Sequence, residues 1–178
     1  MNDYILSSNL LYENLRILKQ AYPFIKTGSI GKSIMGKDIP FVRIGRGQQE
    51  VFYSASYHAN EWITSLVLLE FMYDYCNAVQ SNSSIWNFSA RRLFETVSIY
   101  LVPMVNPDGV DLVTGVLPKT SPSYKQAEKI AYGFATIPFP DDWKANIRGV
   151  DLNLQFPAEW QKAREIKYEQ GFTRPCPS

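Results

Sequence analysis

Two apolar segments constrain the fold of this chain more than any other feature. Residues 62–75 (WITSLVLLEFMYDY) are apolar on nearly every side, which predicts a buried helix. Residues 97–105 (VSIYLVPMV) form an almost continuous β-prone run that is typical of an internal strand. Alternating helices and buried strands indicate an α/β fold. We therefore expect a mixed, mostly parallel sheet with helices on both faces, and functional loops at the carboxyl ends of its strands.

Local patterns predict the remaining elements. The expected helices span 12–22, 62–75, 121–132 and 159–170, and the expected strands span 26–30, 39–44, 51–56 and 97–105. The NPDG sequence at 106–109 is a turn signal, and two prolines and two aspartates make 136–145 irregular. A length of 178 residues suits one domain.

The charge balance argues against several classes of partner. The 18 Lys and Arg residues nearly cancel the 17 Asp and Glu residues, and the charges are scattered, so we expect no nucleic-acid or membrane partner. The longest apolar run is far shorter than the ~20 residues that cross a bilayer. The first 15 residues carry no export signal. We expect a soluble, cytoplasmic protein in which Cys76 and Cys176 are ordinary thiols.

His58 and Glu61 form an H-x-x-E pair where the strand at 51–56 is expected to end. An imidazole nitrogen and a carboxylate oxygen at such a turn can bind one Zn²⁺, and a catalytic zinc typically takes three protein ligands and a water. The pair alone is weak support for a metal site, because a single histidine beside aromatic residues is more often a packed residue.

Three motifs follow one another in an informative order. SYHANEWIT (56–64) resembles the first metal-ligand segment of the zinc carboxypeptidases, the carboxypeptidase A-like superfamily. LVPMVNPDGV (101–110) resembles that family's buried strand and N-P-D-G turn, and WKANIRGVDLNLQFP (143–157) resembles its substrate-binding segment. The resemblance covers approximately 28–160. It implies a zinc metallopeptidase fold, a zinc cofactor and a peptide substrate.

The resemblance also implies roles for individual residues. His58 and Glu61 would be two of the three zinc ligands, and Asn153 would bind a carboxyl group of the substrate. Lys144 stands where the family commonly has an arginine that stabilises the oxyanion, and Arg148 follows four residues later. Either Lys144 or Arg148 could stabilise the oxyanion. Without the surrounding motif, both would be interpreted as solvated loop cations.

Position 154 departs from the family pattern. The family's Asn-Arg pair usually grips a free terminal carboxylate, and Leu154 cannot make that bidentate contact, which argues against a plain exopeptidase. DLNLQFPAEW (151–160) instead resembles the bacterial γ-D-glutamyl-L-diamino acid endopeptidase branch, which has D-L-N-x-Q-F-P-A and cuts cell-wall peptides. The resemblance to this branch implies a peptidoglycan-peptide substrate.

The family's mechanism needs a second histidine ligand, a tyrosine and a general-base glutamate from its C-terminal half. His58 is the only histidine in this chain, so a two-His-one-Glu site cannot form within one copy. We therefore expect 1–178 to be a single truncated catalytic domain, the N-terminal half, with little or no activity alone. The alternatives are a non-catalytic module that binds peptidoglycan peptides, one half of a split enzyme, and an α/β domain with a fortuitous H-x-x-E.

Overall fold

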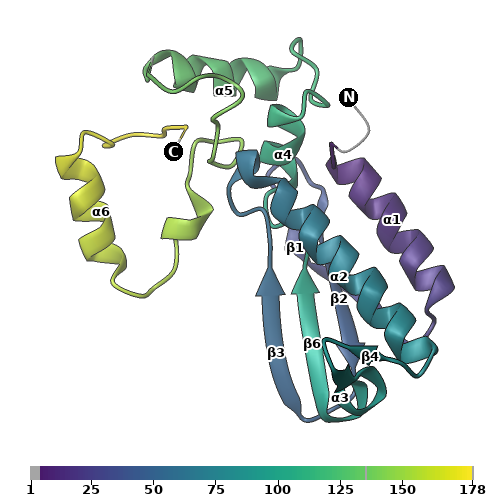
Figure 1. Cartoon of the computed structure of the whole chain (residues 1–178). Coiled ribbons are helices and arrows are strands. Elements are labelled where there is room, and N and C mark those ends of the chain that lie inside the picture. The colour runs from purple at the N-terminus through teal and green to yellow at the C-terminus, as the bar shows by residue number, and fades with distance from the viewer. Residues whose placement is uncertain (1–4, 135, 178) are drawn as a thin grey trace.

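A four-stranded mixed sheet forms the centre of the computed structural model, which describes residues 5–134 and 136–177 (Figure 1). Its strands are β1 (Lys26–Lys32), β2 (Asp38–Gly45), β3 (Gln49–Ser54) and β6 (Val97–Val102), in the order β1-β2-β6-β3. The sheet is mixed, as expected. Of the three pairings between these strands only β3–β6 is parallel, because β1 and β2 form a hairpin and β6 runs antiparallel to β2.

Helices α1 (Ser8–Ala21) and α2 (Ile63–Gln80) lie over one face of this sheet (Figure 1). Leu11, Leu15 and Leu18 recur at helical spacing on α1 and are buried. They share a core with residues of α2, with α3 (Ala90–Thr96) and with the inward side chains of β2 and β6. The helices of this core share one face, so the second helical layer that we expected is not seen among the described residues.

The other elements lie around the carboxyl ends of β3 and β6 or in short connections. They are the 3-10 turns η1 (Ala59–Glu61) and η2 (Leu152–Leu154), the hairpin of β4 (Ser84–Ile85) and β5 (Phe88–Ser89), and helices α4 (Pro107–Val113), α5 (Pro122–Tyr132) and α6 (Trp160–Glu169). In the part of the chain that the structure describes, no helix is long and apolar enough to span a membrane.

Burial raises the pKa of the Cys76 thiol to about 12, which makes it a poor nucleophile.

The N-P-D-G motif starts a helix, which corrects our expectation of a turn. The Asn106 side chain accepts a hydrogen bond from the Gly109 N–H and so caps α4. Pro107 occupies the first helical turn, where its missing N–H costs no hydrogen bond. The same residue types that favour a turn are therefore used here as a helix start.

A buried polar network anchors α4. Asp111 accepts hydrogen bonds from the N–H and the hydroxyl of Ser8, at 2.8 and 2.7 Å. Asp108 accepts one from the Ser33 hydroxyl at 2.9 Å. The Lys37 ammonium lies 2.6 Å from Asp111 and 3.5 Å from Asp108, whose side chains are only 4% and 2% exposed. These contacts tie the start of α1 and the β1–β2 turn to the helix that begins at Asn106.

Replacing Lys37 with methionine is expected to lower the free energy of unfolding by about 3 kcal/mol, because two buried carboxylates lose the one ammonium group that the described residues place beside them. Urea unfolding measures the change. Lys32→Met is the matched control. Lys32 pairs with Asp38 at the surface, where both side chains are more than half exposed, so this replacement should have little effect on stability. Equal losses in the two variants would show that the network does not stabilise the fold.

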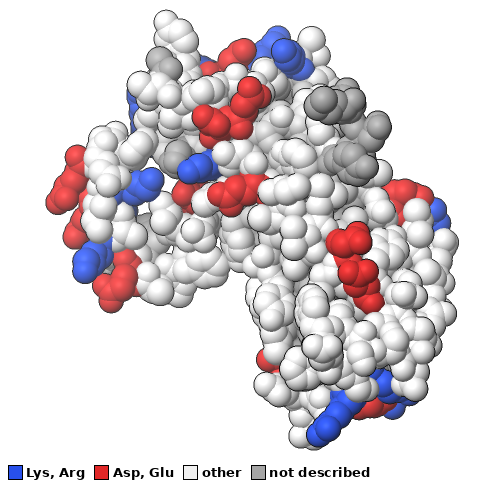
Figure 2. Space-filling model, viewed as in Figure 1, with Lys and Arg blue, Asp and Glu red and all other residues white. Residues whose placement is uncertain are grey.

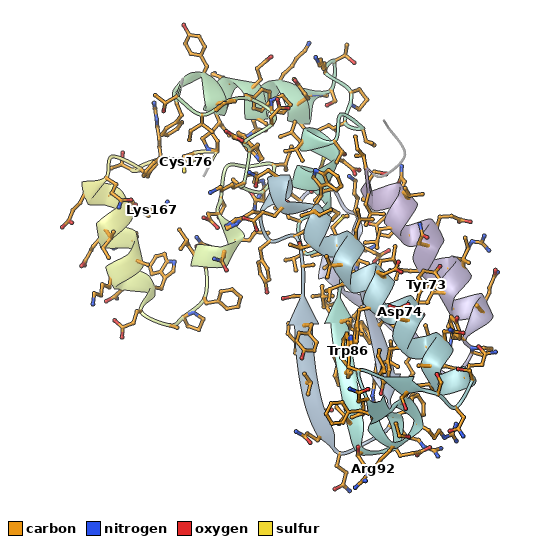
Figure 3. The ribbon with its side chains drawn as sticks, in the orientation of Figure 1. Tyr73, Asp74, Trp86, Arg92, Lys167 and Cys176 are labelled. Atoms are coloured by element: carbon orange, nitrogen blue, oxygen red, sulfur yellow. The ribbon has the colours of Figure 1, made fainter. Side chains whose placement is uncertain are left out.

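The second edge of β3 pairs with no other described strand. Phe52 and Tyr53 on β3 are 58% and 50% exposed, and Val67 on α2 is 63% exposed. A groove of about 920 Å³ runs between α2 and the sheet, beside Tyr73, Asp74 and Trp86 (Figure 3). Apart from a strip of acidic side chains over α2, uncharged side chains dominate the surface over α2 and β3 (Figure 2). Bare strand edges and large apolar patches favour association with other polypeptide.

Residues 1–178 alone are therefore expected to self-associate in a concentration-dependent way, which sedimentation velocity can measure. Tyr53→Lys should weaken this association, because it places a charge beside the open edge. Tyr132→Lys is the control, since Tyr132 is 91% exposed at the end of α5, a helix that lies away from β3 in Figure 1. A chain that stays monomeric at every concentration would contradict this expectation.

Candidate metal centre

A network of hydroxyl groups shapes the turn between β3 and α2. Ser56 is buried in a left-handed conformation, with φ of 50°. Its N–H donates to Thr64 Oγ1 at 3.0 Å, and its hydroxyl lies 2.6 Å from that of Ser65. Thr64 Oγ1 in turn donates to the Glu61 carbonyl at 2.7 Å. The turn is thereby held with His58 just before η1 and Glu61 at its end.

The His58 imidazole lies between two carboxylates. Its Nδ1 is 2.9 Å from Glu61 Oε1, so the two side chains of the H-x-x-E pair meet on one side of the turn. Its Nε2 is 3.3 Å from Asp151 Oδ1. The side chains of His58 and Asp151 are 18% and 12% exposed, whereas that of Glu61 is 50% exposed. Glu61 and Nδ1 therefore form the solvent-facing side of the cluster.

This geometry suits three protonation states of the ring. An imidazolium can donate to both carboxylates, and a neutral ring can donate either from Nδ1–H to Glu61 or from Nε2–H to Asp151. In the tautomer that donates to Asp151, the Nδ1 lone pair and the Glu61 carboxylate face each other across 2.9 Å. Two acceptors at that separation need a cation between them, and the order carboxylate, histidine, metal is typical of zinc sites. An imidazole nitrogen and a carboxylate oxygen are donors that zinc accepts.

His58 and Glu61 do not complete a metal site by themselves. Within residues 5–134 and 136–177, no group of three or more His, Cys, Asp or Glu side chains is arranged to hold a metal ion. Two protein ligands are fewer than a catalytic zinc site uses.

Asn106 joins the segments that form the site. Its Nδ2 donates toward the carbonyls of Tyr57 at 3.2 Å, Ala145 at 3.0 Å and Lys144 at 3.4 Å. Its Oδ1 caps α4 through the N–H of Gly109, and the residue is only 2% exposed. One side chain therefore connects the H-x-x-E turn, the start of α4 and the loop that begins with Trp143.

Close packing and a second hydrogen bond reinforce this junction. A Cβ on Gly109 would lie 2.8 Å from the Cβ of Ala59, so only glycine permits α4 to approach η1 this closely. The Ala59 N–H donates to the Lys144 carbonyl at 2.9 Å. Trp143 is fully buried, and its indole N–H donates to the Ala145 carbonyl at 2.8 Å. The loop therefore cannot shift without disturbing the turn that carries His58.

The structure places the other predicted site residues at different distances from this cluster. The Asn153 N–H donates to Asp151 Oδ1 at 2.9 Å, the same oxygen that faces His58. Lys144 is connected to the H-x-x-E turn through its backbone, and its side chain is partly buried. Arg148 is exposed, and its side chain makes no hydrogen bond or ion pair with the residues that the structure describes. The catalytic roles of Lys144 and Arg148 remain predictions.

Sequence reasoning missed two residues of the site. Asp151 and Asn106 both belong to motifs that the sequence displays, D-L-N and N-P-D-G. Their partners lie far away along the chain, since His58 and Asp151 are 93 positions apart. Only the motif context could have identified these residues, because no local pattern shows which distant group a polar side chain meets.

Comparisons with known proteins agree with the motifs. The zinc carboxypeptidase family model, peptidase M14, matches residues 11–175. The γ-D-glutamyl-L-diamino acid endopeptidase 1 of Lysinibacillus sphaericus is 40% identical over 156 residues, which cover 86% of this chain and 38% of that relative. YqgT of Bacillus subtilis strain 168, an uncharacterized protein, is 36% identical over 169 residues, which cover 90% of this chain and 44% of that protein. The chain spans less than half the length of either relative.

Solved structures show the same fold. Thrombin-activatable fibrinolysis inhibitor superimposes on 64% of this chain with a TM-score of 0.55 at 20% identity, over 28% of its own length. Carboxypeptidase A of Helicoverpa armigera superimposes on 65% of this chain with a TM-score of 0.51 at 22% identity, again over 28% of its length. These similarities establish the fold alone.

Asn106→Ala is expected to lower the free energy of unfolding by about 2 to 3 kcal/mol, because buried carbonyls lose their donor and α4 loses its cap. The ring signals of His58 should also shift in a ¹⁵N-histidine NMR spectrum, since the turn loses an anchor. These signals are unambiguous because the chain has one histidine.

Asn77→Ala is the matched control for this experiment, because Asn77 is exposed on α2. It should change neither the stability nor the His58 spectrum appreciably. If Asn106→Ala left the His58 signals in place, Asn106 would be a stabilising residue with no influence on the site.

Proposed function

Because this chain belongs to the zinc carboxypeptidase family, we propose that it forms part of the catalytic domain of a zinc metallopeptidase with His58 and Glu61 as metal ligands. The observation that carries this proposal is the His58 ring, held between Glu61 and Asp151. A zinc ion bound there would polarise the scissile carbonyl and lower the pKa of a bound water. Asp151 would accept a hydrogen bond from Nε2–H, which keeps the Nδ1 lone pair free for the metal.

Other residues of the chain would act on the substrate. Asn153 is proposed to bind a substrate carboxyl group. Its N–H donates to the Asp151 oxygen that also faces His58, which places Asn153 beside the proposed metal ligands. Lys144 or Arg148 is proposed to stabilise the oxyanion. Lys144 is better placed, because its backbone adjoins the H-x-x-E turn. A cation directed at developing negative charge can contribute several kcal/mol in a water-poor site.

The proposed substrate is a peptidoglycan peptide with a γ-D-glutamyl bond to a diamino acid. The 40% identity to the L. sphaericus endopeptidase supports this assignment. So does Leu154, because a leucine cannot grip the terminal carboxylate that an exopeptidase must recognise.

A working site requires further polypeptide, either later in the same protein or from a second chain. The missing groups are a second histidine ligand and a general-base glutamate. The bare edge of β3 and the groove beside α2 are proposed as the surface on which this polypeptide packs. An added strand would pair with β3, and its apolar side chains would cover Tyr53 and Val67.

Fusing residues 1–178 to the C-terminal part of the L. sphaericus relative tests this function. The fusion should hydrolyse γ-D-glutamyl-diaminopimelate peptides in a zinc-dependent way, and residues 1–178 alone should not. His58→Ala or Glu61→Ala in the fusion should abolish the activity, because the two ligands that remain are fewer than the three that hold a catalytic zinc. Leu154→Arg should shift the preference toward substrates with a free terminal carboxylate.

The outcomes of this assay separate the candidates. Equal zinc-dependent turnover by the unsupplemented chain, or activity that survives His58→Ala, would contradict the proposal. A fusion that binds the peptide and never cleaves it would favour a non-catalytic peptide-binding module.

A further inference from the structure

A separate cavity of about 330 Å³ adjoins the candidate metal centre. One wall consists of Asp151, Leu154 and Gln155 from the loop that faces His58. The opposite wall consists of Arg164 and Lys167 from α6, together with the C-terminal tail. Lys167 and Cys176, which is on the tail, both line this cavity, and their positions can be followed in Figure 3. Because Asp151 borders both spaces, a molecule bound here would lie beside the metal ligands.

The cavity has an excess of positive charge. Arg164, Lys167 and Arg174 line it, whereas Asp151 is the only carboxylate among its described lining residues. One Asp151 oxygen is already engaged by His58 and by the Asn153 N–H. Within the described part of the chain, none of these three cations makes an ion pair. The chain as a whole has a formal net charge of only +1, so this excess is local.

Aromatic rings hold these cations in position. The Arg164 guanidinium lies 4.9 Å from the ring centroid of Trp160, and the Lys167 ammonium lies 4.7 Å from that of Phe172. The Arg174 guanidinium lies 5.3 Å from the ring centroid of Phe134, and its Nη2 donates to the Gly133 carbonyl at 3.4 Å, which leaves its other N–H groups for a ligand. A cation over a ring face is oriented without being neutralised. The N–H groups at the edge of a stacked guanidinium remain able to bind a carboxylate.

We propose that this cavity binds a carboxylate group of the substrate peptide, with Arg164, Lys167 and Arg174 as its charged contacts. The inference rests on the proposed function. A glutamyl residue linked through its γ-carboxyl keeps its α-carboxylate free, and a diamino acid carries at least one more carboxyl group. The cavity volume is within the range of small-ligand sites. These cations would therefore bind a substrate carboxylate, a contact that Leu154 cannot make.

The probe is the dipeptide γ-D-glutamyl-L-lysine, and its fully amidated form is the matched ligand without carboxylates. Isothermal titration of residues 1–178 should show binding of the free acid that weakens with added salt, and much weaker binding of the amide. Arg164→Gln, Lys167→Gln and Arg174→Gln should each raise the dissociation constant about tenfold or more, because each removes a charge-assisted hydrogen bond. Lys162→Gln on α6 is the control, since Lys162 does not line the cavity.

All four lysine and arginine positions lie on or after α6, which has no buried residue, so the variants should stay folded, and a urea melt checks this. The inference is overturned if the wild-type chain does not bind the dipeptide, if the amide binds as tightly as the acid, or if the three variants bind like Lys162→Gln.

These results are distinguishable from a failure of the proposed function. In the active fusion, loss of the three charges should raise KM with little change in kcat. A fusion that cleaves the peptide with an unchanged KM in the variants would refute the cavity alone. Charge-dependent binding by a fusion that never cleaves would refute the catalytic proposal and leave the cavity standing.

Discussion

The hydrogen bonds of Asn106 hold together the parts of the chain from which the site is built. Its side-chain nitrogen donates hydrogen bonds to carbonyls of the H-x-x-E turn and of the Trp143 loop, and its side-chain oxygen caps α4. Helix α4 is in turn fixed to the β1–β2 turn and to α1 by the network around Lys37. The position of the His58 ring therefore depends on contacts that extend across the described structure.

Two incomplete features of the molecule are consistent with each other. The proposed metal centre would have two of the three protein ligands that a catalytic zinc uses, and among the described strands the sheet has an open edge at β3, the strand that leads to His58. One added piece of polypeptide could satisfy both requirements. The fold and the family are established for this chain, whereas its activity and its substrate are proposals.

Much of the fold could be predicted from the sequence, because hydrophobic periodicity is a local signal. The strands at 26–30, 39–44 and 51–56 and the apolar helix after His58 all correspond to observed elements. The relative direction of β2 and β6 is set by tertiary pairing, so the expected parallel majority did not appear among the described strands. N-P-D-G was misassigned because a capping asparagine followed by proline suits a turn and a helix start equally. Asp151 was missed because its partner is distant in sequence.

The most direct test of the account is the ¹⁵N spectrum of the His58 ring as zinc is added. The single histidine makes both ring nitrogens observable without overlap. If His58 is a metal ligand oriented by Asp151, zinc should shift the Nδ1 signal strongly while Nε2 remains protonated, and Glu61→Ala should weaken the effect. If the ring signals of the fusion did not change when zinc was added, or if only the Nε2 signal shifted, the assignment of His58 as a metal ligand would be contradicted.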